Sequence, residues 1–172
     1  PTSGIGERFL LLDQFTTARA AGAVNGTPAE PTGQARTVVD TNLIMSVSGG
    51  EAIINGTPAL ADRLAYPTFV RILGRVTLIR FNDIAAGSTV YIGWNSAAQQ
   101  ENGIRLVSGV LRLFDVGSIS TGVAVAIYSA ATYYTVAVDL RTAGAYVFMK
   151  GGAFTNFTLI GFSAGNTNST HI

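Results

Sequence analysis

The sequence contains no cysteine, a single histidine and few charged side chains. Charged residues make up 12% of the 172 residues, about half the share that is typical of soluble proteins. Without cysteine the chain has no disulfides, no thiol nucleophile and no thiolate metal ligand. The histidine, His171, stands next to the last residue, where we expect it to be exposed. Ser–His–Asp catalysis and histidine-rich metal sites are therefore not expected.

Long apolar runs and clusters of one charge are also missing. No apolar run reaches the roughly 18–20 residues of a membrane-spanning helix, so we expect no membrane span. The basic side chains are ten arginines and Lys150, scattered at a net charge of +1, which argues against a nucleic-acid partner. No signal peptide is visible and the first residue is Pro1, so we expect a processed product or an excerpt of a longer chain.

The low charge sits beside a high apolar content. Apolar residues make up 48% of the sequence, and the remaining surface is rich in Gly, Ser and Thr. This composition favours faces that pack on copies of the same chain, as in a long-lived extracellular or virion protein. A thick two-sheet core beneath a Ser/Thr/Asn surface explains it equally well.

Strand patterns run along most of the chain. Residues 1–8 form a polar, extended lead, and residues 9–15 (FLLLDQF) predict the first strand. Residues 16–36 predict a surface crossover, because Pro28 and Pro31 interrupt any strand there. Beyond it, strand signals recur about every 8–12 residues between Gly-rich turns. They include residues 76–81, 90–95, a hairpin at 104–113, the cleanest alternation at 134–140, and residues 146–149 and 157–162.

No window of more than about ten residues keeps a helical period of 3.6. The sequence therefore predicts an all-β fold: a two-sheet antiparallel β-sandwich of jelly-roll or concanavalin A-like type, with about eleven strands. We expect a single domain over residues 9–172, preceded by the lead at residues 1–8.

Several short segments, taken in order, resemble a known family. They are residues 13–42 (DQFTTARAAGAVNGTPAEPTGQARTVVDTN), 46–50 (SVSGG), 74–76 (GRV), 91–95 (YIGWN), 134–140 (YTVAVDL) and 142–158 (TAGAYVFMKGGAFTNFT). Together they resemble laminin-G-like, concanavalin A-like sandwich domains of bacteriophage and metagenomic structural or adhesion proteins. The resemblance covers most of residues 9–163. It implies a module of a larger protein whose last strand pairs near the first.

The resemblance leaves one strand position open. No clear closing strand follows Phe162, and an unpaired sheet edge is an aggregation hazard unless something covers it. Residues 1–12 would cover such an edge on a neighbouring copy by strand addition. The assembly candidates in this segment are Phe9, Leu10, Leu11 and Leu12.

Enzymatic and metal chemistry find little support. Sandwich glycosidases need two carboxylates that face each other across the sugar, and the ten acidic residues include no E-x-D-x-E cluster. We therefore expect no enzyme. The resemblance implies a Ca²⁺ at the sandwich rim, for which Asp40 with Asn42, and Asp83, are the loop candidates. No D-x-D-x-D spacing supports them, turn capping is the favoured interpretation, and no cofactor is predicted.

Glycan binding and glycosylation both have candidate residues. Exposed aromatics that would stack on sugars are Tyr66, Trp94 (beside Asn95) and Tyr133, although Trp94 is in phase with the core residues Val90 and Ile92. Tyr133 and Tyr134 are out of phase, so one of the two faces outward. The glycosylation sequons are at Asn25, Asn55, Asn156 and Asn168, little more than chance provides.

Two functions remain. The first is a non-enzymatic structural subunit that self-assembles as a homo-oligomer or polymer, in a virion (tail, fibre or decoration) or an extracellular filament. The alternative is a glycan-binding adhesion module of a larger secreted or tail protein, with a cell-surface glycan as partner.

Overall fold

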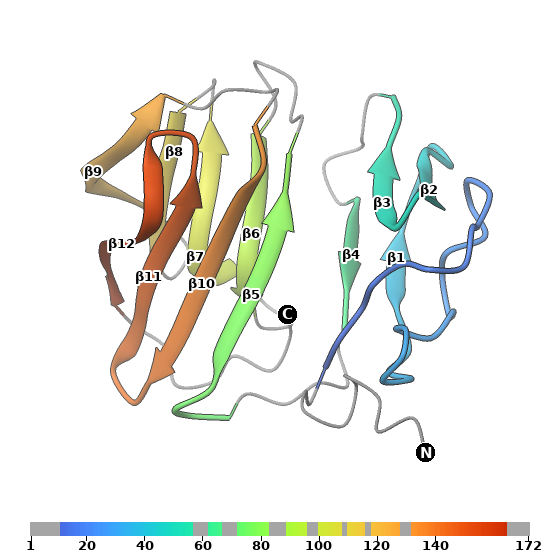
Figure 1. The fold of residues 1–172 in the computed structure, drawn as a ribbon, viewed down its shortest axis with the longest axis horizontal. Coiled ribbons are helices and arrows are strands. Elements are labelled where there is room, and N and C mark those ends of the chain that lie inside the picture. Colours follow the sequence, from blue (N-terminus) through green and yellow to red (C-terminus); the bar gives the residue numbers. More distant parts are fainter. Residues whose placement is uncertain are drawn as a thin grey trace. The chain divides into compact units, whose positions relative to one another are not determined.

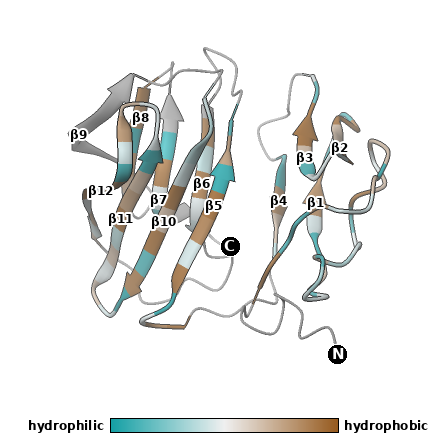
Figure 2. Cartoon of the chain, in the orientation of Figure 1, coloured by the Kyte–Doolittle hydropathy of each residue, from teal (hydrophilic) through white to brown (hydrophobic). Residues whose placement is uncertain are grey.

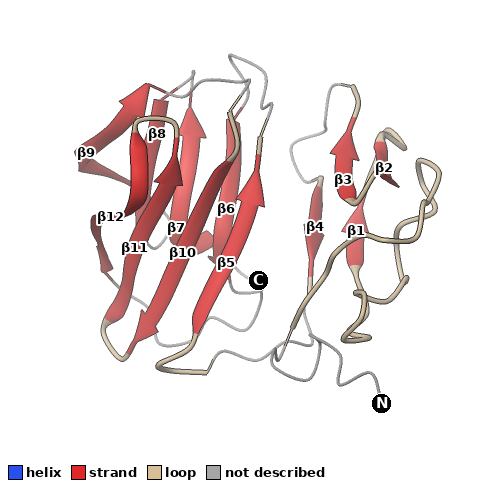
Figure 3. Ribbon diagram, in the orientation of Figure 1, coloured by secondary structure: helices blue, strands red, loops and turns tan. Residues whose placement is uncertain are grey.

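The computed structural model describes residues 11–56, 62–66, 72–82, 89–95, 100–107, 110–115, 118–127 and 132–164. All regular elements among them are strands in antiparallel sheets (Figure 3), so the all-β prediction is confirmed. No described segment is a helix long and apolar enough to cross a bilayer. The chain divides into two compact units, Pro1–Phe69 with Ile172 and Val70–His171. The prediction of one domain over residues 9–172 stays a prediction.

The first unit contains two small two-stranded sheets. Its strands are β1 (Thr37–Val39), β2 (Met45–Ser48), β3 (Glu51–Ile54) and β4 (Arg63–Ala65). β2 and β3 form a hairpin, and β1 pairs with β4. Residues 11–36 contain no strand longer than an isolated bridge. The strand predicted at residues 9–15 is thus wrong over its described part, 11–15, and the crossover predicted at 16–36 is extended and irregular.

A small core holds the first unit together. Val24, Val38, Met45 and Val47 are buried and pack as one cluster, with Phe15 and further side chains against it. Met45 and Val47 alternate with more exposed residues along β2, as expected of a strand with one covered face. Val24 belongs to the irregular segment, so burial of this one side chain helps to fix the crossover in place.

The second unit contains two four-stranded antiparallel sheets (Figure 1). Their strands are β5 (Val76–Phe81), β6 (Thr89–Asn95), β7 (Gln100–Val107), β8 (Val110–Asp115), β9 (Ser118–Ile127), β10 (Tyr134–Arg141), β11 (Gly144–Gly151) and β12 (Phe154–Ala164). One sheet has the order β12-β11-β10-β5, and the other β6-β7-β8-β9. Within these two sheets, every pairing joins strands that are consecutive in the chain, except the pairing of β10 with β5. This pairing does not confirm a jelly-roll order.

The two sheets of this unit lie face to face, with β10 and β11 against β7 and β12 against β8. Alternate residues of β10 fill the space between them: Val136, Val138 and Leu140 are fully buried. Figure 2 shows the corresponding hydrophobic stretches along strands of both sheets. The second unit is therefore sandwich-like, and its strands occur where the sequence predicts them, with β5 matching residues 76–81 at both ends.

Polar groups also join the two sheets. The Trp94 Nε1–H of β6 donates to Thr77 Oγ1 of β5 at 3.0 Å. Asn102 Nδ2 of β7 donates to Ser163 Oγ of β12 at 2.9 Å, and Ser163 Oγ donates to the Phe114 carbonyl of β8 at 2.6 Å. The Trp94, Asn102 and Ser163 side chains thus hydrogen-bond across the interface, which offsets the burial of these polar atoms.

Candidate functional site

A charged cluster lies in the interior of the first unit. Arg36 Nε is 2.5 Å from Asp13 Oδ2, and Arg36 Nη2 is 2.5 Å from Asp13 Oδ1. The Arg36 side chain is completely buried and that of Asp13 is 6% exposed. The Tyr66 hydroxyl donates to Asp13 Oδ2 as well. This bidentate, hydrogen-bonded pair is the geometry that a buried ion pair needs to offset its desolvation.

Glu30 extends the cluster to the surface. Its Oε2 accepts hydrogen bonds from the Thr16 hydroxyl at 2.6 Å and the Thr17 N–H at 2.8 Å. Nearby, Thr32 Oγ1 accepts from the Leu12 N–H and donates to the Leu12 carbonyl, both at 2.9 Å. These bonds fasten residues 12–17 to the loop at residues 30–36.

The pKa values in the cluster show which groups stay charged. Burial raises the pKa of Asp13, but the hydrogen bonds from Arg36, Tyr66 and the Phe15 N–H outweigh it, so its pKa lies below the usual value. The Thr16 hydroxyl and Thr17 lower the pKa of Glu30 to about 2. Burial and the Asp13 carboxylate raise the pKa of Tyr66. All three groups are held in their ordinary neutral-pH forms, which suits a structural role better than proton transfer.

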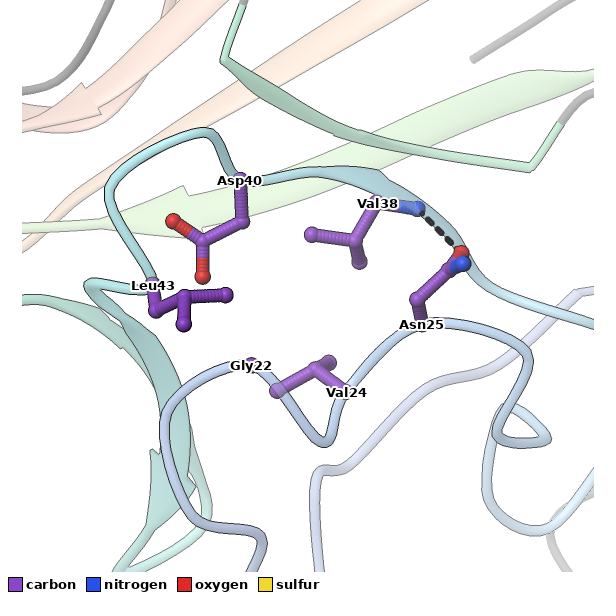
Figure 4. A pocket seen from close by; sticks show the side chains of 6 residues that line it. All are labelled: Gly22, Val24, Asn25, Val38, Asp40 and Leu43. Carbon is purple, nitrogen blue, oxygen red and sulfur yellow. Dashed lines mark hydrogen bonds between the residues drawn. The ribbon is translucent and has the colours of Figure 1, made fainter.

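A shallow pocket of about 200 Å³ lies in the same unit, lined by Gly22, Val24, Asn25, Val38, Asp40 and Leu43 (Figure 4). Its polar side chains already bind backbone groups. Asn25 Oδ1 accepts from the Val38 N–H at 2.9 Å, and the Asp40 carboxylate accepts from the N–H groups of Ile44 and Met45, each at 2.8 Å.

Asp40 therefore caps the turn before β2, as the turn-capping interpretation of the calcium candidates predicts. Its neighbour Asn42 is exposed, and Asp83 lies outside the described residues. Within the described ranges, no group of three or more His, Asp or Glu side chains is placed to hold a metal.

The predicted glycan-stacking aromatics are mostly buried. Trp94 is 2% exposed and Tyr66 is 8% exposed, so neither ring is available to stack on a sugar; these two assignments are wrong. Trp94 fills the core instead, as its phase with Val90 and Ile92 indicated. Tyr133 is 41% exposed, but the Arg80 guanidinium covers its ring at 3.9 Å. The side chain of Asn95 lies outside the described residues.

The other predicted site residues, for glycosylation and for assembly, differ in their exposure to solvent. Asn25, Asn55 and Asn156 are exposed, and Asn168 lies outside the described residues. Of the assembly candidates, Phe9 and Leu10 are likewise outside, whereas Leu11 and Leu12 are half-buried. The Leu12 backbone is bound by Thr32 of its own unit, so it is not available to pair with a neighbour's sheet.

A different surface was missed by the sequence reading. The sheet β12-β11-β10-β5 has a second face, which points away from β6–β9. The strand registers place on it the apolar residues Val76, Leu78, Ala137, Tyr146, Phe148, Phe157, Leu159 and Phe162. We call this set the outer face.

Large side chains of the outer face are open to solvent. Val76 and Leu78 of β5 are each 57% exposed, and Phe157, Leu159 and Phe162 of β12 are 47%, 52% and 39% exposed. In β11, Tyr146 is 41% exposed and meets Phe162 edge-on, with ring centroids 5.0 Å apart. Contiguous apolar surface of this kind usually marks a place where something binds.

The signal for this face was present in the sequence. Residues 146–149 (YVFM) and 157–162 (FTLIGF) carry apolar side chains at neighbouring positions, and neighbours in a strand point to opposite faces. Strands that are apolar on both faces are normally covered on both. No protein-family model, curated protein or solved structure matches the chain.

Proposed function

We propose that the chain is a non-enzymatic structural subunit that self-assembles, in an extracellular filament or a virion. The observation that carries this proposal is the exposed outer face of the sheet β12-β11-β10-β5. A monomer that left this face in water would forfeit the free energy of burying it, about 25 cal/mol per Å². The low charge of the sequence supports the same proposal, because little electrostatic repulsion opposes association at a net charge of +1.

The glycan-binding alternative has less support. Two of its stacking candidates, Tyr66 and Trp94, are buried. The third, Tyr133, has one ring face covered by Arg80. The outer face does offer aromatic rings at Tyr146, Phe157 and Phe162, but only Tyr146 among them carries a hydrogen-bonding group, and a sugar site needs several. We also propose that the sandwich is of the jelly-roll or concanavalin A-like class.

The native mass in dilute neutral buffer tests the proposal. Light scattering over a hundredfold range of protein concentration, with electron microscopy of the same samples, is expected to show a mass that is a multiple of 17.9 kDa and a regular particle or filament. A single species of 17.9 kDa at every concentration would contradict self-assembly. A glycan array would then decide on the alternative.

A further inference from the structure

We infer that the occupant of the outer face is a second copy of this chain, packed sheet against sheet; this deepens the proposed function and rests on it. The residues involved form a regular grid. The strand registers place Leu78, Ala137 and Phe148 in a central row, with Leu159 beside Phe148. The row on one side of the central row contains Val76, Asp139, Tyr146 and Phe162. The row on the opposite side of the central row contains Arg80, Thr135 and Lys150.

The size of the apolar surface matches what a dimer needs. Val76, Leu78, Tyr146, Phe157, Leu159 and Phe162 are between 39% and 57% exposed. Since a complete aromatic side chain presents about 150–250 Å², the six together leave roughly 500 Å² of apolar surface. A stable interface buries about 800 Å² per partner, of which roughly 60% is apolar. The outer face thus supplies about the whole apolar share of one such interface.

The charges on the outer face favour one orientation of the second copy, because that orientation keeps the basic rows of the two copies apart. Arg80 and Lys150 occupy the row on one side of the central row. Asp139 occupies the row on the other side, and Arg141 follows it on the same face of β10. Asp139 Oδ2 binds Arg141 at 2.6 Å, whereas its Oδ1 is buried without a hydrogen-bond partner among the described residues. A two-fold axis that runs across the strands, between the two sheets, lays the basic row of one copy over the row of Asp139 in the other.

The same axis predicts which residues face each other. It passes over the central row, so Leu78 of one copy lies opposite Leu78 of the other. Face-to-face sheets are about 10 Å apart, and that separation is too large for a disulfide between facing positions. A short bismaleimide would bridge two facing thiols at this separation. Because the sequence has no natural cysteine, the reagent would react only with the introduced cysteine.

The first test introduces a charge. Leu78→Lys and Leu159→Lys place a charge on the outer face at positions 57% and 52% exposed, and Ile54→Lys is the matched control on β3, 54% exposed. We expect the light-scattering mass of both outer-face variants to fall at least twofold, to 17.9 kDa in the limit, while Ile54→Lys keeps the wild-type mass. An unchanged circular dichroism spectrum and thermal midpoint establish that each variant is folded.

The second test is cross-linking, which does not depend on disrupting anything. Leu78→Cys is expected to give a covalent dimer with the bismaleimide, and Ile54→Cys much less. Wild-type assembly with no effect of Leu78→Lys and no Leu78→Cys dimer would overturn this inference and leave the proposed function standing. A wild-type monomer at all concentrations would overturn both.

Discussion

The ion pair between Asp13 and Arg36 is the residue-scale feature with the largest expected effect on stability. Both side chains are almost completely withdrawn from water, and Arg36 also donates to Thr27 Oγ1 at 2.9 Å. Charged groups in such surroundings are stable only while each has its partners. The pair joins residues 23 positions apart, so it helps to close the irregular crossover, whose backbone pairing consists of isolated bridges.

Removal of Arg36 therefore leaves a buried carboxylate uncompensated. We expect Arg36→Met to lower the free energy of unfolding of the first unit by about 3–5 kcal/mol. The matched control is Arg141→Ala, because the Arg141–Asp139 pair has an arginine that is 55% exposed and should contribute at most about 1 kcal/mol. Urea unfolding followed by amide exchange in residues 11–56 measures the first effect, and equal losses in the two variants would contradict it.

The carboxylates of the same cluster predict how stability depends on pH. Both Asp13 and Glu30 have pKa values below their usual range, that of Glu30 at about 2. A carboxylate whose pKa is lower in the folded state stabilises the fold fully at pH values above its unfolded-state pKa, about 4. This stabilisation is lost as the pH falls from there through the folded-state pKa. We expect the protection of amides in residues 11–56, relative to an unstructured peptide at the same pH, to fall between about pH 4 and pH 2.

Two comparisons test the origin of that acid response. The only tryptophan, Trp94, lies in the second unit. The pH at which its fluorescence changes should therefore be lower than the pH at which amides of the first unit lose their protection. Glu30→Gln should remove part of the pH dependence, because the glutamine does not titrate. Identical profiles of the variant and the wild type would show that Glu30 plays no part.

Only half of this cluster could be predicted from the sequence. Asp13 Oδ1 accepts a hydrogen bond from the Phe15 N–H two residues later, at 3.1 Å, which is a local turn contact. Local spacing carries that information. Arg36 was counted among scattered surface arginines, because nothing in a one-dimensional pattern indicates a partner 23 residues away. Tyr66 was misassigned for the same reason.

At the scale of strands, two glycines set the spacing of β6 and β7. Gly93 and Gly103 are paired across these strands. A Cβ on Gly103 would lie 2.8 Å from Gly93 Cα and closer still to the Ile92 carbonyl oxygen. Backbone atoms on a paired strand cannot give way as a flexible side chain can, so this approach requires glycine.

We expect Gly103→Ala to destabilise the second unit by about 3 kcal/mol or more. Gly74→Ala is the control: Gly74 has φ +75° and nothing within 4 Å of a Cβ, so its cost is the left-handed backbone alone, about 1–2 kcal/mol. Urea unfolding followed by Trp94 fluorescence measures both. A smaller loss for Gly103→Ala than for Gly74→Ala would show that the strands separate freely at this point.

Strand positions followed from the sequence far better than strand neighbours did. The alternation of residues 134–140 and the turn that ends at Gly144 located β10, because both are local properties. The pairing of β10 with β5 is not local, and neither the sheet order nor the outer face could be derived without it. The apolar residues of β11 and β12 predict strands, but the neighbours that complete their second face do not follow from the sequence pattern.

At the scale of the whole molecule, the proposed assembly has a thermal signature. Burial of an apolar face weakens on cooling, and the outer face has few charged groups to compensate. We expect the light-scattering mass at a fixed concentration to fall between 37 °C and 4 °C and to recover on warming. Added salt should change it little, because screening acts on charges. Dissociation by salt at constant temperature would instead point to a contact dominated by ion pairs.

The pairing of β5 with β10 has a consequence for how the chain is made on the ribosome. Phe81 of β5 pairs with Tyr134 of β10, so translation of roughly 50 further residues separates the two strands, about 3–10 seconds at ordinary elongation rates. The strands β6–β9 form a meander of sequential neighbours and can pair as they emerge. During that interval β5 has no sheet to join. The protein therefore depends most on protection from premature aggregation while it is a nascent chain, and not as a finished subunit.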